Sequence, residues 1–227
     1  MLLAIRGSYY AFEAYSGARG HKGYAFAYGV SGLFIPAALS VVLTISEGGF
    51  IKMVDDNPQL DYVALFTSQL SWSIVVLAVV AVLYISSVFL TWYASRAGDE
   101  SASELMRKYA LIWAGPLILA AFGIIIEMRA VHNWHYENML NLWWLFVISG
   151  ILFIVTIWLI GNRKRYGVAV VLLILQFATA FYAYGISHYP YLLYPYLSIK
   201  DSVTSPAMGI ALVIVFVFGL ALLIPSL

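Results

Sequence analysis

Cysteine is absent from this chain of 227 residues, and charged residues make up only 10% of it. The lack of cysteine excludes a disulfide framework, a thiolate nucleophile and a thiolate-ligated metal. Soluble domains usually carry about 25% charged residues, so water is not the main solvent of this chain. Its net charge of +1 is too small to indicate nucleic acid as a partner. Motifs of common enzymes are also missing: there is no Walker A loop, no G-x-S-x-G elbow, no H-E-x-x-H pair and no dinucleotide fingerprint.

What the sequence has in abundance is apolar and aromatic residues. Hydrophobic residues account for 63% of the chain, aromatic residues for 16%, and the mean hydropathy is +0.90. A helix needs about 20 mostly apolar residues to cross the hydrocarbon of a membrane. Six segments qualify, namely residues 24–47, 72–93, 109–128, 142–160, 167–187 and 207–227. Tyrosine and tryptophan stand at the ends of several of them, as expected at headgroup depth.

The first fifteen residues are expected to form the inner end of a seventh span. A secretory signal places basic residues before its apolar region, whereas here Arg6 follows the short apolar stretch 1–5. We therefore expect this chain to start inside a helix whose first part is missing.

The distribution of lysine and arginine predicts the orientation. Alternate connections between spans hold eight basic residues in one set and three in the other. The first set is Arg19, Lys22, Arg96, Arg107, Lys108, Arg163, Lys164 and Arg165, and the second is Lys52, Arg129 and Lys200. Cytoplasmic loops carry the excess of positive charge, so the first set is expected in the cytoplasm. Because all connections are short, consecutive spans run antiparallel, and the sequence predicts an all-α, polytopic transmembrane helical bundle in one membrane domain, residues 1–227.

Histidine is the residue most often used to hold haem or a metal, and all four histidines fall in connections or at span ends. They are His21, His132, His135 and His188. A haem buried in a bundle needs an axial ligand at helix depth, so this pattern argues against haem on this chain. His132 and His135 have a spacing that could suit a metal if the stretch were helical. With Trp134 and Tyr136 beside them, an ordinary wet interfacial loop is favoured, and the sequence predicts no catalytic, cofactor-binding or metal-binding residue.

Ionisable residues inside predicted spans are the remaining functional candidates. Arg6 and Glu13 lie about two turns apart on one helix face, which favours a structural ion pair over a proton path. Glu47 and Glu127 end long apolar runs at the predicted outer face. Either could take part in proton access, but simply reaching the interface is the favoured interpretation.

The stretch 187–206 places four tyrosines around Pro190 and Pro195, between two long apolar runs. We call residues 188–201 the tyrosine–proline loop. Tyrosine rings sit in lipid while their hydroxyls stay wet, so the loop is expected to lie along the outer membrane face. Asp201 is expected to cap a turn or the next helix rather than to act in catalysis.

Four blocks of the sequence resemble subunit II of the cytochrome bd-type quinol oxidases, particularly the Firmicutes-like branch. The blocks are residues 2–12, residues 34–40 leading to 46–50, the tyrosine–proline loop, and Ser205–Pro206 before the last span. The resemblance implies a nine-helix family fold of two four-helix bundles and one peripheral helix. In this chain, residues 1–47 would be the remainder of the first bundle, 72–187 the second bundle, and 207–227 the peripheral helix.

The resemblance also implies a function. The complex would oxidise quinol and reduce O₂ in a bacterial cytoplasmic membrane, supporting electron transport and the proton-motive force. Haems b and d and the quinol-oxidising loop would belong to a larger subunit I, with a small single-helix subunit as a further partner. This chain would be a haem-free subunit for assembly. Arg6, Glu13, Glu127 and Asp201 stay candidates for structural or proton-access roles.

The alternative function is an independent transporter or channel. Transporters tend to gather polar groups at a midplane site. The polar residues inside the predicted spans are scattered rather than convergent: Ser40, Thr44, Ser86, Ser87 and Gln176. The sequence therefore favours the oxidase subunit.

Overall fold

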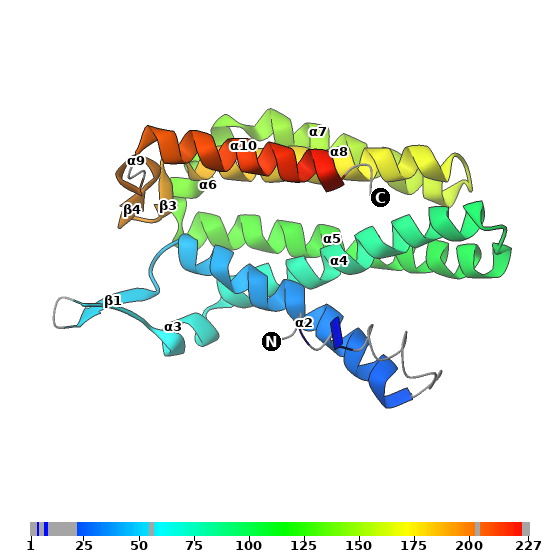
Figure 1. Ribbon diagram of the computed structural model, residues 1–227, viewed down its shortest axis with the longest axis horizontal. Helices are drawn as coiled ribbons and strands as arrows, with labels where there is room; N and C mark the ends of the chain where they lie inside the picture. The colour runs from blue at the N-terminus through cyan, green and yellow to red at the C-terminus, as the bar shows by residue number, and fades with distance from the viewer. Residues whose placement is uncertain (1–3, 5–6, 9–21, 55–56, 203–204, 224–227) are drawn as a thin grey trace.

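The structure is a computed structural model that describes residues 4, 7–8, 22–54, 57–202 and 205–223 (Figure 1). Nearly all of this part is helical. The helices are α2 (Lys22–Ser46), α3 (Tyr62–Thr67), α4 (Gln69–Arg96), α5 (Glu100–Val131), α6 (Asn133–Asn141), α7 (Trp143–Gly161), α8 (Tyr166–His188), α9 (Ile199–Ser202) and α10 (Pro206–Leu223). Two small antiparallel hairpins, which the all-α prediction did not include, join them: β1 (Ile51–Val54) with β2 (Asn57–Leu60), and β3 (Tyr191–Leu193) with β4 (Leu197–Ser198).

Five of the described helices are long and apolar enough to cross a membrane: α4, α5, α7, α8 and the stretch Phe26–Ser46 of α2. The polytopic helical fold expected from the sequence is thereby confirmed. The sixth predicted span corresponds to α10, a shorter apolar helix, so the span number stays a prediction. The partial span predicted at residues 1–15 falls largely outside the described residues.

Local chemistry explains where several helices begin. Asp99 caps α5 by accepting a hydrogen bond from the backbone N–H of Ala102 at 2.9 Å. Asp61 does the same for α3 through the N–H of Ala64 at 3.1 Å. Gly98 has a φ of +76°, which reverses the chain between α4 and α5 at little steric cost. These capping and turn residues lie outside the apolar stretches of the helices that they border. The polar backbone groups at the helix ends are therefore satisfied before the chain enters lipid.

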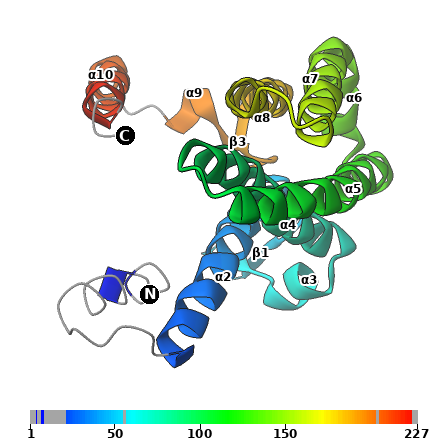
Figure 2. The same cartoon turned by 90° about the vertical axis from the view of Figure 1, so that its right-hand side faces the viewer.

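Four helices, α4, α5, α7 and α8, share one apolar core. Its buried residues are Val80, Tyr84, Val88, Ala110, Ala114, Leu117, Phe153, Leu159, Ile160, Ala169 and Leu173. Small residues such as Ala110 and Ala169 allow the helices to approach closely, as membrane helices commonly do. The pair α4 and α5 forms a central layer, with α7 and α8 on one side and α2 on the other (Figure 2). The division into bundles predicted for the whole family stays a prediction.

The two ends of this bundle differ in charge. The α4–α5 and α7–α8 connections meet at one end, where Glu104 accepts hydrogen bonds from Arg107 and Arg163 (Figure 1). Six of the basic residues expected in the cytoplasm lie in or next to these two connections: Arg96, Arg107, Lys108, Arg163, Lys164 and Arg165. The ends of α2 and α8, together with α6 and the tyrosine–proline loop, lie at the opposite end.

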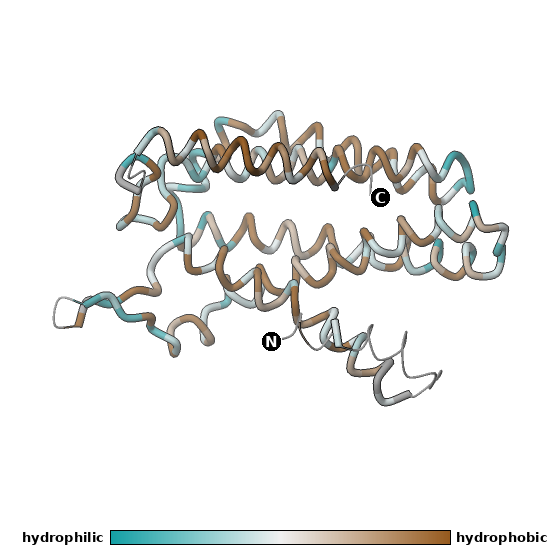
Figure 3. The backbone as a smooth tube through the Cα atoms, in the orientation of Figure 1, coloured by the Kyte–Doolittle hydropathy of each residue, from teal (hydrophilic) through white to brown (hydrophobic). Residues whose placement is uncertain are grey.

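Figure 3 shows that apolar residues run along the long helices. Many large apolar side chains of these helices are exposed. The described part of α10 is exposed along nearly its whole length, and Leu222 is 75% exposed. Figure 2 shows α10 standing apart from α7 and α8. Apolar surface of this extent requires lipid or a partner protein as its surroundings.

At the end opposite the basic residues, the tyrosine–proline loop is fastened to the end of α2. The backbone N–H of Tyr194 donates to the carbonyl of Ser46 at 3.0 Å. Gly48 has a φ of +92°, and a Cβ added there would overlap the Tyr194 carbonyl. Gly49 has a φ of +83°, yet nothing lies within 4 Å of its own ideal Cβ. The loop and the chain after α2 therefore need glycine at position 48 for two separate reasons.

We predict that Gly48→Ala destabilises the protein clearly more than Gly49→Ala. Both substitutions force a side chain into a left-handed backbone conformation, which costs about 1–3 kcal/mol. Only Gly48→Ala adds a clash with the backbone of Tyr194. Thermal unfolding of the purified protein in detergent would measure the difference, and equal losses in the two variants would contradict the described contact.

Candidate functional site

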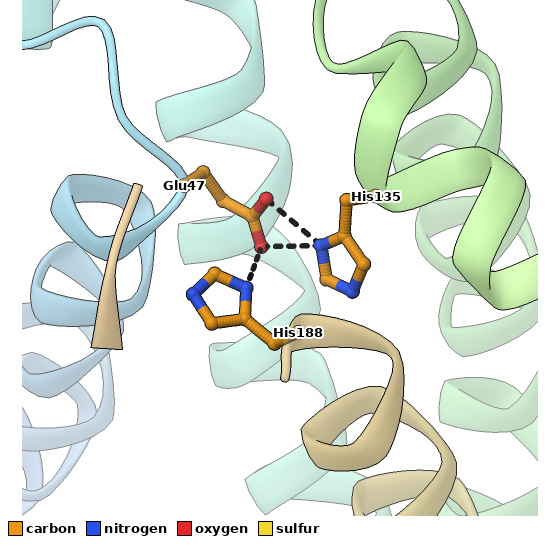
Figure 4. Close-up of side chains that lie close together, drawn as sticks. All are labelled: Glu47, His135 and His188. Atoms are coloured by element: carbon orange, nitrogen blue, oxygen red, sulfur yellow. Dashed lines mark hydrogen bonds and ion pairs between the residues drawn. The ribbon is translucent and has the colours of Figure 1, made fainter. Parts of the chain in front are cut away.

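Three buried side chains from distant parts of the chain meet at the end of the bundle opposite the basic residues. Glu47 directly follows α2, His135 lies in the first turn of α6, and His188 is the last residue of α8 (Figure 4). The exposed fractions are 0% for Glu47, 0% for His135 and 8% for His188. We call these three residues the Glu–His cluster.

Glu47 occupies a position that is unfavourable for a carboxylate. It follows the C-terminal end of α2, where the helix dipole and the free carbonyls repel negative charge. Burial adds the cost of removing the charge from water. A buried carboxylate at this position therefore needs strong hydrogen-bond donors.

Donors to Glu47 come from two other helices. His135 Nδ1 lies 3.0 Å from Oε1 and 2.9 Å from Oε2, and the hydroxyl of Tyr184 donates to Oε1. Burial would raise the pKa of Glu47, but hydrogen bonds from His135 and Tyr184, together with the charges of His135 and His188, hold that pKa below its ordinary value. The carboxyl group is therefore ionised, and because a carboxylate only accepts, Nδ1 of His135 carries a hydrogen.

The other ring nitrogen of His135 contacts a serine. Nε2 lies 2.7 Å from Oγ of Ser187, which in turn lies 2.8 Å from the backbone carbonyl of Tyr184. A hydroxyl has one hydrogen. When that hydrogen points to the carbonyl, Nε2 must donate and the imidazole is charged. When it points to Nε2, the imidazole is neutral, so the same geometry accommodates both charge states.

His188 is held differently. Its Nδ1 lies 3.7 Å from Oε1 of Glu47, and the backbone of Ser46 is a further polar neighbour. Among the described residues, neither ring nitrogen makes a hydrogen bond of standard geometry. Its ring packs against the rings of His135 at 5.0 Å and Trp134 at 5.3 Å. Buried polar side chains are nearly always hydrogen-bonded, so this imidazole needs an explanation.

Aromatic rings close the cluster from the side of the tyrosine–proline loop. Trp134 stacks on Tyr194 with ring centres 4.2 Å apart and an interplanar angle of 11°. Its ring also stacks on His135 at 5.1 Å and meets the edge of Tyr191 at 5.6 Å. These contacts explain why the loop is rich in tyrosine: two of its rings pack inward over Trp134 and keep water from the Glu–His cluster.

His132 precedes α6 as its N-cap residue and is also buried. Burial lowers the pKa of His132, although the charge of Glu47 opposes the effect. The imidazole of His132 is therefore neutral at the edge of the cluster.

Two interpretations from the sequence are wrong. The stretch around His132 and His135 is not a wet interfacial loop, because Asn133–Asn141 is helical and His135 is fully buried. Glu47 does not reach the interface, because three side chains from α6 and α8 enclose it. The sequence holds one indication that these residues could meet: Glu47, His132, His135 and His188 all fall at the predicted outer face.

Among the remaining candidates from the sequence, Glu127 is the one whose side chain the structure describes. Glu127 is half-buried near the end of α5 and is not a member of the Glu–His cluster. Asp201 has its backbone in α9, while its side chain lies outside the description. Arg6 and Glu13 fall outside the described residues. Their predicted roles stay predictions.

Comparisons with known proteins place the whole chain in one group. Residues 1–227 match the family described as "Cytochrome bd terminal oxidase subunit II". Over 235 residues the chain is 33% identical to "Putative cytochrome bd menaquinol oxidase subunit II" of Bacillus subtilis (strain 168), covering 100% of this chain and 67% of the relative. The structure is similar to a chain of "The structure of bd oxidase from Geobacillus thermodenitrificans", with a TM-score of 0.85 and 56% identity, over 99% of this chain and 68% of that one.

We predict that Tyr184→Phe destabilises the protein by about 1–2 kcal/mol, because a charged acceptor in the interior loses a donor. Tyr182→Phe is the matched control: it removes a hydroxyl from the same helix at a side chain that is 62% exposed. Thermal unfolding of both variants measures the effect. Equal stability of the two would show that Tyr184 does not support the carboxylate.

Proposed function

Because the chain belongs to the cytochrome bd terminal oxidase subunit II family, we propose that it serves its complex as a haem-free, non-catalytic subunit. It is a multi-pass protein of the plasma membrane and part of a quinol oxidase that also contains subunit I. In this proposal the larger subunit I holds the haems, oxidises the quinol and reduces O₂. This chain completes the assembly and helps to retain the haems there.

The observation that carries the proposal is the nature of the bundle core. Among the described residues, the core shared by α4, α5, α7 and α8 is filled by aliphatic, small and aromatic side chains. A haem in that core would need an axial histidine or methionine beside an open space of porphyrin size. The buried residues of this described core include neither histidine nor methionine.

The histidines at the end of the bundle also fit a haem poorly. The ring of His135 packs against Trp134 at 5.1 Å and Tyr184 at 5.0 Å. The ring of His188 packs against Tyr184 at 6.0 Å as well as against Trp134. Aromatic rings thus occupy the space that a porphyrin would need next to either imidazole, which supports placing the haems on the partner.

The exposed faces of α2 supply surface for that partner. Phe34, Leu39 and Val42 are 57%, 65% and 64% exposed although they belong to one apolar helix. A partner helix or lipid must cover them. A complex with subunit I provides such a cover for part of this surface, and a small single-helix subunit could use another part.

The transporter alternative receives no support. Hydroxyl groups of Ser40, Thr44 and Ser87 each donate to a carbonyl of their own helix. They therefore satisfy the backbone locally and do not converge on a midplane site of the kind that transporters build.

We predict that both the haem and the quinol-oxidising activity remain with the larger partner subunit when the subunits of the complex are separated. The intact complex would be purified through a tag on this chain, assayed for menaquinol oxidation (the quinol in the name of the Bacillus relative), and then separated into subunits. Haem extracted as the pyridine complex should be found with the larger subunit, and the isolated chain should show no Soret absorbance.

Haem bound to the isolated chain, or quinol oxidation by the chain without its partner, would contradict the proposal. His132→Gln serves as a control, because His132 is a buried histidine that is not a member of the Glu–His cluster. Its complex should hold as much haem as the unchanged complex, because no histidine of this chain is an axial ligand in this proposal.

A further inference from the structure

We propose that Glu47, His135 and His188 bind a divalent transition-metal ion, with zinc as the ion that their chemistry favours. The sequence predicted no metal on this chain, and the inference is independent of where the haems reside. It rests on the geometry of the Glu–His cluster and on the buried imidazole of His188, whose ring nitrogens lack hydrogen bonds of standard geometry.

The three ligand atoms already have the spacing of a coordination sphere. One nitrogen from each histidine and one carboxylate oxygen all lie within 4.8 Å of one another. Zinc–ligand bonds of about 2.0–2.1 Å place tetrahedral ligands about 3.4 Å apart. From Oε1 of Glu47, Nδ1 of His135 lies 3.0 Å away and Nδ1 of His188 lies 3.7 Å away, on either side of that value. An adjustment of these side chains would bring the three ligand atoms onto one ion.

Two of the three ligands, His135 and Glu47, also have the support that metal ligands usually have. Histidines that bind metals generally donate their second ring nitrogen to a neighbouring acceptor, and ligating carboxylates are themselves hydrogen-bonded. Nε2 of His135 is held by Ser187, and Tyr184 donates to the carboxylate of Glu47. Asn138 in turn donates to the backbone carbonyl of Ser187 at 3.0 Å.

His188 supplies the second, independent observation. Its side chain is 11% exposed, and its Nδ1 faces Oε1 of Glu47 at 3.7 Å without making a hydrogen bond of standard length. A hydrogen-bonded pair of Glu47 and His135 leaves this ring with only the 3.7 Å contact to Glu47 and the backbone of Ser46 as polar neighbours. An ion between the three side chains gives His188 a bond and explains why a polar ring is placed here.

The donor set favours zinc. Two imidazole nitrogens and one carboxylate oxygen suit Zn²⁺, and three protein ligands leave a fourth position for water. Magnesium and calcium prefer oxygen ligands, and a site for Cu⁺ would be expected to use sulfur. On binding, the ion replaces the hydrogen on Nδ1 of His135, which leaves the protein as a proton. One ionised carboxylate and two neutral imidazoles then face the charge of +2.

Such an ion would join three parts of the fold. Glu47 follows α2, which lies outside the core of four helices, whereas His135 and His188 belong to α6 and α8. A metal bond from Glu47 would therefore fasten α2 to the rest of the bundle at this end.

Metal analysis of the intact complex tests the proposal. The complex would be purified without chelator from cells grown with added zinc, and zinc would be measured by mass spectrometry against protein from amino-acid analysis. We expect about one zinc ion per copy of this chain. Glu47→Gln and His188→Gln should lower the zinc content about tenfold or more. Glu137→Gln is the matched control, because it changes an exposed acid of α6 and should leave the zinc content as it is.

X-ray absorption at the zinc edge gives a readout that does not depend on the stability of the variants. The unchanged complex should show two imidazoles on zinc, and the His188→Gln complex, reloaded with zinc, should show one. Haem iron does not interfere at this energy.

The proposal is overturned if the unchanged complex holds no zinc and, after chelator treatment, takes up none from a solution on the order of 10 micromolar. The cluster is then a hydrogen-bonded acid–base pair. It is also overturned if the complex holds zinc that Glu47→Gln and His188→Gln leave in place, because the ion then sits elsewhere.

Discussion

The buried carboxylate of Glu47 is the constraint on which this end of the molecule depends. It carries a negative charge at the C-terminal end of α2, where neither the helix dipole nor water can stabilise it. Its donors come from α6 and α8, 88 and 137 residues further along the chain. The positions of these helices, the helical turn at His135 and the packing of the tyrosine–proline loop all serve to surround one charge.

The rest of the bundle follows a simpler rule. In a membrane each helix satisfies its own backbone, and helices associate through close packing. The small side chains between α4, α5, α7 and α8 fit that rule, as do the hydroxyls that bond to carbonyls of their own helices. The middle of the bundle therefore resembles that of other membrane helical bundles. The buried charged and titratable side chains of the Glu–His cluster lie instead at the ends of the helices.

This contrast explains what could be predicted from the sequence. Apolar length and the alternation of basic residues are properties of whole segments, and an error at a few positions does not hide them. The sequence therefore predicts the spans even though α5 extends beyond residues 109–128 in both directions. The Glu–His cluster depends instead on three single residues and on how the ends of α2, α6 and α8 are placed. His135 was read as lying in a wet loop because its neighbours are polar and aromatic. Only the stacking of Trp134 on Tyr194 reveals that these aromatic neighbours face inward.

The long separation between Glu47 and its donors has a consequence for biogenesis. A ribosome completes α2 and releases Glu47 well before it makes His135, and it makes Tyr184 and His188 later still. A newly inserted α2 thus has no partner for its carboxylate and must keep that end hydrated at the membrane surface. Only after α8 is inserted and the tyrosine–proline loop folds back over Ser46 can the charge be enclosed. The end of α2 consequently leaves water only after α8 has been inserted, although α2 is synthesised long before α8.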